Sequence, residues 1–454
     1  MKIKIEISEA LVGHFSDVKI CFSEPDGTEK KVSLHIRNFS DAYDLTRDRS
    51  SVKFDFFLIS AIVYGIDNLF DRSKYSVDGW ARDFEVEFPV YNVEKWTGNE
   101  QILESALKFL SGDYWSISFV KNTTRYIYRA NPRRRRKSIK RYANNSIKSV
   151  SLFSGGLDSL IGVIDQLEDL KPNEKILFAS HLDSNSPKPN QDQILLSNYL
   201  KKVYPDKIYW IQTKVTLNRV DSELNEVKAE PSSRSRSILF IGLGCYLSPV
   251  NKLIIPENGT ISINYPLTPS RVSSLSTRTT HPYVLDTLQK FIFSIGIDIK
   301  IDNPYFSLTK GEMILGCKNK SVLEGIYQES VSCGKRGHNR TWKDRTGTKH
   351  CGVCMPCVYR RASLNKNNWD NQLYGNDLLK SDSLDSHNDL NALISYLNKD
   401  LPKEKMKRDL LVYGSIEFEK LESYAEMVIR SKEEVIQLFR DKGSKFLKSQ
   451  LKYL

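Results

Sequence analysis

The stretch Val150-Ser151-Leu152-Phe153-Ser154-Gly155-Gly156-Leu157-Asp158-Ser159 passes from a short apolar run, through two adjacent glycines, into residues with helical spacing. Adjacent glycines permit backbone conformations that other residues avoid, and they leave room for a ligand to approach the main chain. The amides of such a turn and of the helix that follows form a binding site for anions. Ser154 and Ser159 add hydroxyl donors, and Asp158 can hold Mg²⁺ or cap the helix. The stretch therefore predicts a phosphate-binding loop between a buried strand and a helix.

This loop differs from the Walker-type phosphate loop, because no lysine follows its glycines. Without a lysine on the terminal phosphates, the loop suits the pyrophosphate leaving group of an adenylation. We therefore expect a chain that cleaves ATP to AMP and pyrophosphate, and a tight turn that binds nothing is the alternative. The residues expected to bind ATP are Ser154, Gly155, Gly156, Leu157, Asp158 and Ser159.

Short apolar runs alternate with longer helical segments on either side of this loop. The expected strands are Ser149–Phe153, Ile176–Ser180, Lys207–Gln212 and Lys252–Pro256. The expected helices are Leu160–Leu167, Gln193–Val203, Arg236–Leu247 and Tyr283–Ile295. This alternation predicts an α/β fold with a doubly wound parallel sheet and right-handed crossovers. Because such sheets bind ligands beyond the carboxyl ends of their strands, the loops after the four strands are expected to surround one pocket.

The flanking sequence divides the chain into further regions. Residues 1–128 predict an α+β domain, 129–146 a basic linker, 147–366 the ATP-binding domain and 367–454 a helical region. In the first of these, strands are expected at Lys2–Ile7, Lys31–Ile36, Phe84–Val90 and Tyr114–Val120, and helices at Phe56–Phe70 and Glu100–Leu110. In the last, helices are expected at Asp389–Leu397 and Leu421–Phe439. A solvated linker is the favoured interpretation of the basic run at Arg133–Lys137, with nucleic-acid contact or a strip that docks a partner protein as alternatives.

Length and composition agree with a cytoplasmic protein of two or three domains. The chain has 454 residues, of which 40% are hydrophobic, and it contains no apolar run long enough to span a membrane. Its first residues alternate as a strand does and lack the apolar core of a signal peptide. The formal net charge of +12 favours anionic partners, which include nucleotides, nucleic acid and acidic proteins.

Four of the seven cysteines cluster near residue 350. Cys351, Cys354 and Cys357 are each three residues apart, and Cys333 precedes them. Four converging thiolates are typical of structural zinc. An iron–sulfur cluster is an alternative, although the fourth Cys of a ferredoxin run is missing, and free thiols are another. His338 and His350 could replace a ligand but are expected to be bystanders. The zinc should pin an irregular segment near the rim of the active site.

The phosphate loop together with Cys351-Gly352-Val353-Cys354-Met355-Pro356-Cys357-Val358-Tyr359-Arg360 resembles the 7-cyano-7-deazaguanine synthase (QueC-like) family. The stretches Pro231–Arg236 and Pro304–Glu312 are similar to two further segments of that family, and the resemblance covers roughly residues 147–365. It implies a PP-loop ATP pyrophosphatase fold of the HUP-like type, a ligase that uses ATP. The family converts a 7-deazaguanine carboxylate and ammonia into an amide and then a nitrile.

The resemblance also implies roles for individual residues. Asp158 and the loop would hold the ATP phosphates with Mg²⁺, and Lys310 would neutralise charge on the leaving pyrophosphate. Lys310 has an alternative role at a helix start, because Thr309-x-x-Glu312 is a capping box. Arg236 is the third catalytic candidate, as a ligand of phosphate or of the substrate carboxylate.

The substrate region departs from the family pattern. The family's loop after the fourth strand is replaced by a polar stretch between residues 257 and 282, which could bind a different base or a larger substrate. The substrate-binding candidates are Glu257, Asn258, Arg271, Arg278 and His281, with loop packing as the alternative. The added N-terminal and C-terminal regions are similar to QueC-like proteins of Qat-type anti-phage defence systems. This likeness implies a partner protein, whose amine could accept the activated carboxylate in place of ammonia.

Two other functions fit parts of the sequence. A PP-loop enzyme that thiolates tRNA would suit the basic charge, but it needs catalytic cysteines, and Cys245 and Cys317 are isolated. A non-catalytic ATP-binding scaffold of a defence complex would keep the fold without the chemistry. The acceptor, whether ammonia or a protein amine, is left open by the sequence.

Overall fold

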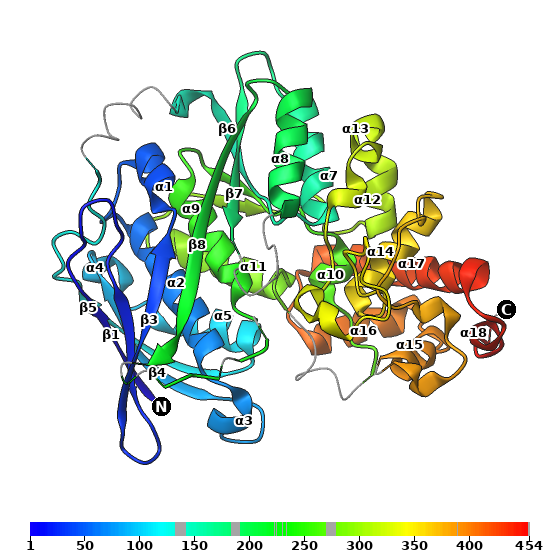
Figure 1. The fold of residues 1–454 in the computed structure, drawn as a ribbon, viewed down its shortest axis with the longest axis horizontal. Coiled ribbons are helices and arrows are strands. Elements are labelled where there is room, and N and C mark those ends of the chain that lie inside the picture. The colour runs from blue at the N-terminus through cyan, green and yellow to red at the C-terminus, as the bar shows by residue number, and fades with distance from the viewer. Residues whose placement is uncertain are drawn as a thin grey trace.

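The structure is a computed structural model that describes most of the 454 residues (Figure 1). The described ranges are 1–131, 142–182, 191–221, 223, 225–228, 230–232, 234–268, 278–387 and 389–452. The basic run at Arg133–Lys137 and the substrate candidate Arg271 lie outside these ranges. Among the helices within them, none combines the length and the apolar character that crossing a membrane requires.

Ten strands of the described chain form one sheet, in the spatial order β10-β9-β6-β7-β8-β3-β2-β1-β4-β5. The first five strands in sequence are β1 (Lys2–Ile7), β2 (Val18–Ser23), β3 (Glu29–Arg37), β4 (Asp83–Val90) and β5 (Tyr114–Lys121). The others are β6 (Ile147–Leu152), β7 (Lys175–His181), β8 (Ile208–Asp221), β9 (Lys252–Ile254) and β10 (Lys300–Asp302). Figure 1 shows β6, β7 and β8 in the middle of the molecule, between the first strands and the C-terminal helices.

The half of the sheet that contains the phosphate loop is parallel. Strands β8, β7, β6, β9 and β10 lie side by side, and each neighbouring pair is parallel. The strand that comes first in sequence, β6, is therefore central. This is the strand order of doubly wound sheets, which bind ligands outside the carboxyl ends of their strands. The expected α/β fold with a largely parallel sheet is confirmed.

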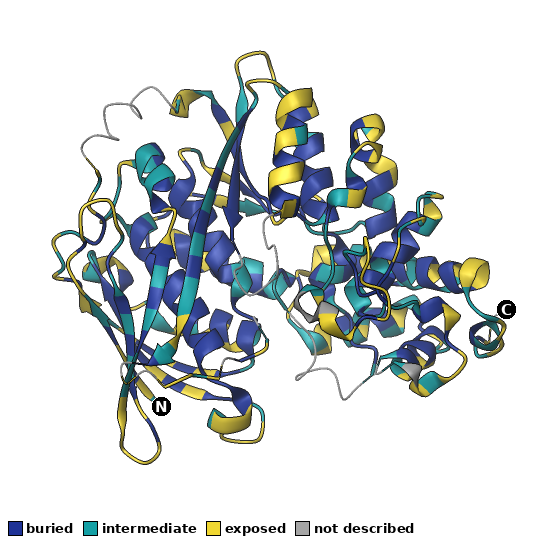
Figure 2. Ribbon diagram, viewed as in Figure 1, coloured by how far each residue is buried: buried dark blue, intermediate teal, exposed yellow. Residues whose placement is uncertain are grey.

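Helices cover both faces of the parallel strands. The helices of this part are α7 (Leu157–Glu168), α8 (Gln191–Val203), α9 (Arg236–Leu247), α10 (Gly259–Ile263), α11 (Pro282–Ser294), α12 (Lys310–Gly316) and α13 (Lys320–Glu324). On β7, Ile176 and Phe178 pack with α7 and α8, whereas Leu177 and Ala179 pack with α9 and α11. Successive strand residues point to opposite faces, so a strand buried on both sides is apolar throughout. Figure 2 shows an exposed outer stripe on α8 and a buried α9.

Strand β8 is longer than the strand predicted to end at Gln212. It continues to Asp221, and its second half pairs antiparallel with β3, where Lys214 lies opposite Arg37. In this half Val215 is buried, and the residues on either side of it are polar. The prediction that a loop follows Gln212 is wrong. With only Val215 as a buried apolar residue, the second half of β8 could not be distinguished from a polar loop in the sequence.

The pairing of β8 with β3 joins the N-terminal strands to the parallel half in one continuous sheet. The four expected N-terminal strands and two helices are present, whereas β2 and α1 (Phe39–Thr46) were not predicted. The other N-terminal helices are α2 (Val52–Leu69), α3 (Arg72–Tyr75), α4 (Val93–Trp96) and α5 (Glu100–Ser111). Helix α2 packs closely on α9 at Gly242, which has no side chain. A Cβ atom at this position would lie only 2.3 Å from Oγ of Ser60.

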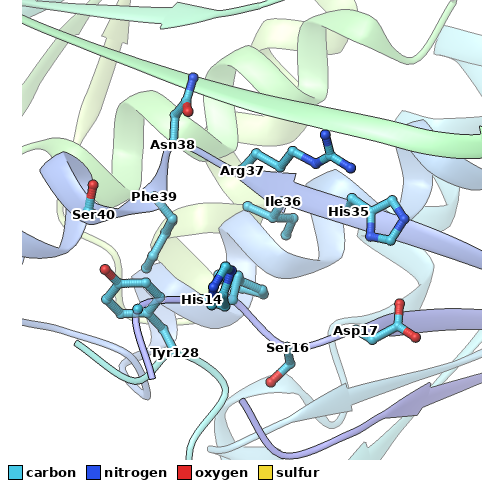
Figure 3. A pocket seen from close by; sticks show the side chains of 12 residues that line it. His14, Ser16, Asp17, His35, Ile36, Arg37, Asn38, Phe39, Ser40 and Tyr128 are labelled. Atoms are coloured by element: carbon cyan, nitrogen blue, oxygen red, sulfur yellow. The ribbon is translucent and has the colours of Figure 1, made fainter. Parts of the chain in front are cut away.

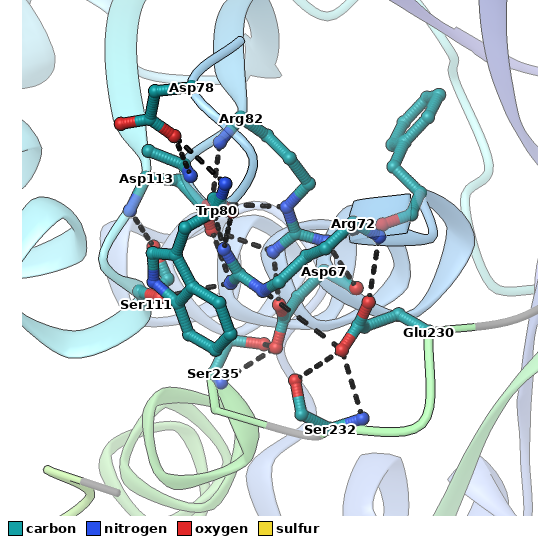
Figure 4. Close-up of polar contacts among 12 residues, drawn as sticks. Asp67, Arg72, Asp78, Trp80, Arg82, Ser111, Asp113, Glu230, Ser232 and Ser235 are labelled. Carbon is teal, nitrogen blue, oxygen red and sulfur yellow. Dashed lines mark hydrogen bonds and ion pairs between the residues drawn. The ribbon is translucent and has the colours of Figure 1, made fainter. Parts of the chain in front are cut away.

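A buried ionic network ties the N-terminal elements to the segment that leads into α9 (Figure 4). Arg82, which is fully buried, donates to Oδ1 of Asp67 at 2.7 Å and to Oδ2 of Asp113 at 2.6 Å. The second oxygen of Asp67 accepts the amide of Ser235 at 2.8 Å, and Arg72 donates to Asp113 at 2.6 Å. Because the buried charges are paired and hydrogen-bonded, their desolvation cost is offset. The network fixes the end of α2 against the start of α9.

The C-terminal part of the chain forms a second apolar core around one long helix. Its helices are α14 (Met355–Lys366), α15 (Leu390–Leu397), α16 (Lys403–Tyr413), α17 (Phe418–Lys442) and α18 (Lys445–Ser449). The expected helices at Asp389–Leu397 and Leu421–Phe439 are confirmed as α15 and α17, whereas α14 and α16 were not predicted. Side chains of α14 and of the segment after α10 share this core, so the tail packs directly on the preceding α/β part of the chain.

We predict that Asp67→Ala lowers the free energy of unfolding by about 3–5 kcal/mol, the usual result of removing one partner from a buried ion pair. Urea denaturation followed by circular dichroism would measure the change. Asp286→Ala is the matched control, because Asp286 pairs with Lys290 on the exposed surface, where ion pairs contribute little. Equal effects of the two substitutions would contradict a stabilising role for the network.

Candidate functional site

The predicted phosphate loop lies at the carboxyl end of β6, between this strand and α7. Gly155 has a φ angle of +85°, and a Cβ atom there would lie 2.7 Å from Oδ2 of Asp192. Any larger residue at this position would be strained and would collide with the start of α8. Gly156 is the N-cap of α7 and has no side chain with which to cap the helix. The amides of Gly156 and Leu157 in this loop donate to the hydroxyls of Ser154 and Ser332.

Two serine hydroxyls complete the loop. Oγ of Ser154 and Oγ of Ser159 lie 3.2 Å apart, and Ser159 also donates to the carbonyl of Gly156 at 2.9 Å. Oγ of Ser154 accepts the amide of Gly156 at 3.3 Å, and Gln193 donates to the Ser154 carbonyl at 3.1 Å. These bonds hold the loop in shape, and a phosphate oxygen can take the place of the internal acceptors.

Asp158 and Lys310 form a buried ion pair behind the loop. Nζ of Lys310 lies 2.8 Å from Oδ2 of Asp158, and the side-chain amide of Asn258 donates to the same oxygen at 2.8 Å. All three side chains are buried, although they come from α7, α12 and the turn before α10. Burial alone would raise the pKa of Asp158, but the Lys310 ammonium together with hydrogen bonds from Glu257, Lys310 and Asn258 outweighs burial, and the pKa of this carboxyl is lowered. Asp158 is therefore a carboxylate with a fixed counterion.

Glu257 is the second carboxyl group of this centre. Its pKa is raised well above the ordinary value, because the group is buried and lies beside the Asp158 carboxylate. Two neighbouring carboxylates cannot both ionise easily unless a cation is shared between them. The Asp158–Glu257 pair, with one lysine beside it, can accept further positive charge. The structure thus brings four predicted site residues, Asp158, Glu257, Asn258 and Lys310, to a single place.

The segment before Cys333 closes the site from another side. The amide of Val331 donates to the carbonyl of Gly155 at 2.9 Å, and the amide of Leu157 donates to Oγ of Ser332 at 3.2 Å. A cavity of about 180 Å³ lies between these elements. It is lined by Ser154, Gly156, Asp158, Ser159, Pro256, Glu257, Ile261, Lys310, Val331, Ser332 and Pro356. The loops after β6 and β9 therefore share one pocket, as expected, whereas no described residue of the segments after Ser180 and Gln212 is in its lining.

The four predicted cysteines converge at the rim of this pocket. The Sγ atoms of Cys333, Cys351, Cys354 and Cys357 all lie within 4.8 Å of one another. Amides of the chain point at the sulfurs: that of Cys351 donates to Sγ of Cys333 at 3.3 Å, and that of Cys354 to Sγ of Cys351 at 3.3 Å. Gly352 has a φ angle of +79°, and a Cβ atom there would lie 1.9 Å from the carbonyl oxygen of Asn376. The cluster can hold a metal ion such as zinc.

The cysteine cluster is connected to the phosphate loop by buried polar residues. Nε2 of His350 accepts the amide of Ser332 at 3.3 Å, and burial together with the nearby Arg360 lowers the pKa of His350 well below its ordinary value. A neutral imidazole is the form that accepts this bond. Arg360, fully buried on α14, donates to Oγ of Ser330 at 3.0 Å and to the carbonyl of Tyr327 at 3.0 Å. The side chain of His338 lies outside the described part of the structure.

Three predicted site residues are placed elsewhere. Arg236 lies in the first turn of α9 with its guanidinium 5.5 Å from the ring centroid of Phe240, and Arg278 lies 4.2 Å over the ring of Phe109. His281 is the N-cap of α11, where Nδ1 accepts the amide of Tyr283 at 3.2 Å. These residues are absent from the lining of the phosphate-loop cavity.

A second cavity lies in the N-terminal part of the chain (Figure 3). It has a volume of about 600 Å³ and opens between the segment before β2 and the end of β3. Figure 3 shows His14, Asp17, His35 and Arg37 around it, with Tyr128 at its side. It is larger than the phosphate-loop cavity but contains neither the glycine loop nor the cysteines.

Sequence reasoning missed the residues that surround the central ion pair. Ser332 and Val331 precede Cys333 directly, yet neither residue type signals a phosphate site. Thr309 was identified only as a helix cap, whereas its hydroxyl also donates to the distant Glu434 at 2.5 Å. Contacts between such remote segments leave no local pattern, so only the fold could reveal them.

We found no match to this chain among protein-family models, curated proteins or solved structures.

We predict that Cys354→Ser lowers the metal content of the purified protein and weakens its binding of a fluorescent ATP analogue. The cluster positions Val331 and Ser332, which contact the phosphate loop, so its loss should loosen that loop. Elemental analysis by mass spectrometry and fluorescence titration would measure the two effects. Cys21→Ser is the control, because Cys21 is a free cysteine outside the cluster. Full ATP-analogue affinity in a metal-free Cys354→Ser protein would contradict this coupling.

We also predict that His281 weakens the fold at low pH. Burial, with Arg278 nearby, lowers the pKa of His281 from 6.5 to about 3. Between these two pH values the imidazole is protonated in the unfolded chain and neutral in the folded chain. The stability that the neutral ring contributes is present above pH 6.5 and is lost as the pH falls toward 3. In His281→Asn, which keeps an N-cap acceptor, this part of the pH dependence should vanish. The prediction would be contradicted if the free energy of unfolding fell by the same amount between pH 7 and pH 4 in the wild type and in His281→Asn.

Proposed function

We propose that the chain is a PP-loop ATP pyrophosphatase of the HUP-like type that activates a carboxylate by adenylation. The observation that carries this proposal is the buried Asp158–Lys310 pair behind a two-glycine loop, at the carboxyl end of the central parallel strand. This edge is where sheets of this strand order bind their ligands. Loop amides, two hydroxyls and an ammonium group are the donors that a pyrophosphate group requires.

The reaction that fits this arrangement is a displacement at the α-phosphorus of ATP. An oxygen of the substrate carboxylate bonds to that phosphorus, and the bond from phosphorus to the bridging oxygen of pyrophosphate breaks. Negative charge grows on the departing pyrophosphate, where the loop amides and Lys310 stabilise it. Because the carboxylate oxygen now carries AMP, a nitrogen nucleophile can attack the carbonyl carbon and release AMP.

Two metals belong to the proposal. Asp158 would hold Mg²⁺, with Glu257 beside it, because carboxylate and phosphate oxygens are the ligands that Mg²⁺ prefers. Bound there, Mg²⁺ would neutralise phosphate charge. The four converging thiols fit structural zinc, which closes a tetrahedral site without an open position for catalysis. Zinc would hold the segment from Cys333 to Cys357 against the phosphate loop.

A 7-deazaguanine-like base is the substrate class that we propose, in an anti-phage defence setting. The support is the likeness of the phosphate loop and of the cysteine motif to the 7-cyano-7-deazaguanine synthase (QueC-like) family, and of the added regions to its Qat-type relatives. The product would be an amide or nitrile of the base, or an amide with an amine of a partner protein. The net charge of +12 suits an anionic ligand or an acidic partner.

The properties of the cysteines disfavour the tRNA-thiolating alternative. That chemistry uses thiolates as nucleophiles, and thiolates form readily only when the cysteine pKa is low. Burial raises the pKa of Cys245 and of Cys317 to about 12, and burial with Glu6 nearby raises that of Cys21 to about 11. The remaining four cysteines form the cluster. No cysteine of the described chain is therefore placed as a free, acidic thiol near the phosphate loop.

We predict that the full chain releases pyrophosphate from MgATP in the presence of 7-carboxy-7-deazaguanine, and that Asp158→Asn and Lys310→Met lower the rate by about a hundredfold or more. Such losses follow when a group that stabilises transition-state charge is removed. An enzyme-coupled pyrophosphate assay would measure the rate. Asp169→Asn is the control, because Asp169 pairs with Lys318 at the exposed surface close to α7.

Two outcomes separate the proposal from its alternatives. Binding of ATP without pyrophosphate release, with the base alone and with candidate partner proteins, would favour the scaffold. If the acceptor is a protein amine, the intact mass of a co-expressed partner should increase in a manner that depends on Asp158. An unchanged partner mass, together with release of the free amide or nitrile, would identify ammonia as the acceptor.

A further inference from the structure

One face of the C-terminal helix α17 contacts the segments that hold the central ion pair. Met427, Arg430 and Glu434 lie at positions i, i+3 and i+7, so they share a face of the helix. Each contacts a segment that supplies a hydrogen-bond partner of Asp158. Sequence reasoning found no site residue in this tail, and the phosphate-loop cavity does not include α17.

Glu434 contacts the first turn of α12, where Lys310 is located. Its Oε1 accepts the hydroxyl of Thr309, the N-cap of α12, at 2.5 Å and the ammonium of Lys366 at 2.8 Å. A Cβ atom at Gly311 would lie 2.6 Å from the same oxygen, so the carboxyl group is packed tightly on the residues flanking Lys310. Only 8% of Glu434 is exposed, which makes the contact an internal one.

Arg430 and Met427 extend this contact in both directions. Arg430 donates to Oε1 of Glu312 at 2.6 Å and to the carbonyl of Ser307 at 2.9 Å, on either side of the Thr309 cap. Met427 lies against Gly259, where a Cβ atom would come within 2.9 Å of its Cε. The amide of Gly259 donates to the carbonyl of Leu308 at 2.8 Å. The turn that carries Asn258 and the turn that carries Lys310 are thus bonded to each other and covered by α17.

We propose that Glu434 is a positioning residue for Lys310, and that α17 holds both hydrogen-bond partners of Asp158 in place. Glu434 acts through Thr309: the shared hydrogen bond fixes the N-cap, and the N-cap sets the direction in which the next residue, Lys310, leaves the helix. Arg430 fixes the same turn through Glu312. The C-terminal region is therefore part of the catalytic centre's framework. This inference rests on the proposed function only for the role that Lys310 plays.

The experiment measures how well Lys310 is held, without using ATP. The full-length protein is treated with the N-hydroxysuccinimide ester of acetic acid, and the acetylation rate of each lysine is followed by peptide mass spectrometry. In the wild type Lys310 should react slowly, because it is buried and bonded to Asp158. Glu434→Ala should raise its rate roughly tenfold, as expected when a hydrogen bond to a buried charged group is lost. Lys53 lies in α2 and donates to the carbonyl of Ser248, so a faster acetylation of Lys53 would reveal global unfolding.

Matched variants decide the interpretation. Glu433→Ala changes the neighbouring, exposed glutamate of the same helix and should leave the Lys310 rate unchanged. Glu434→Gln keeps an oxygen that can accept from Thr309 and should restore slow acetylation. Asp158→Asn should raise the rate by itself, since it weakens the bond that holds Lys310. If Glu434→Ala also exposes Lys53, Thr309→Val replaces it, with Thr309→Ser as the rescue.

Several results would overturn the proposal. Acetylation of Lys310 at the wild-type rate in Glu434→Ala, with Asp158→Asn fast, would show that Glu434 does not position the lysine. Fast acetylation in Glu434→Gln as well would show that bulk packing matters and the hydrogen bond does not. A wild-type protein that releases no pyrophosphate would instead contradict the proposed function, while these acetylation rates would still test the positioning role.

Discussion

The ion pair between Lys310 and Asp158 is the interaction around which the candidate site is organised. It joins residues that are 152 positions apart, at 2.8 Å, in the interior. Taking two charges out of water is costly, and their attraction repays this cost only when the geometry is good and further hydrogen bonds are made. Asn258 supplies such a bond, and burial beside the Asp158 carboxylate raises the pKa of Glu257. A buried centre of this kind needs rigid surroundings.

Those surroundings come from two parts of the chain that sequence reasoning treated as separate. On one side the cysteine cluster, His350 and Arg360 hold the segment that bonds to the phosphate loop. On the other side α17 holds the turns that carry Lys310 and Asn258. Both supports lie after residue 320 in sequence, whereas the glycine loop lies before residue 160. The site therefore forms only when the C-terminal half has folded onto the parallel sheet.

Local sequence patterns predicted the elements well where a strong period or a special residue type was present. Helix α9 spans Arg236–Leu247 and β1 spans Lys2–Ile7, both as predicted. The glycine loop and the four cysteines were found because their chemistry needs those residue types at those spacings. They account for the phosphate loop, Asp158 and the metal ligands, and the similarity of Pro304–Glu312 to a family segment added Lys310.

Long-range contacts could not be predicted in this way. The second half of β8 alternates too weakly to be recognised as a strand, because few of its side chains are buried, and its partner β3 lies far away in sequence. His281 was a substrate candidate on grounds of residue type, yet the structure uses it as the cap of α11. Glu434 and Arg430 are ordinary charged residues on an amphipathic helix, and nothing in the local sequence distinguishes them from their exposed neighbours.

Aromatic side chains of the N-terminal region stack on two arginines from later in the chain. The guanidinium of Arg234 lies 4.8 Å over the ring of Trp80, and that of Arg278 lies 4.2 Å over the ring of Phe109. Stacking on an aromatic face restricts an arginine without neutralising its charge. Burial, with Arg72 nearby, lowers the pKa of Arg234 to about 10, but the group stays charged at neutral pH. Because β3, α2 and the Arg82 network fix this region to the sheet, its aromatic rings hold the segments that precede α9 and α11 through these two arginines. A region that looks like an accessory domain in the sequence is thus an integral part of the sheet and of the packing around α9 and α11.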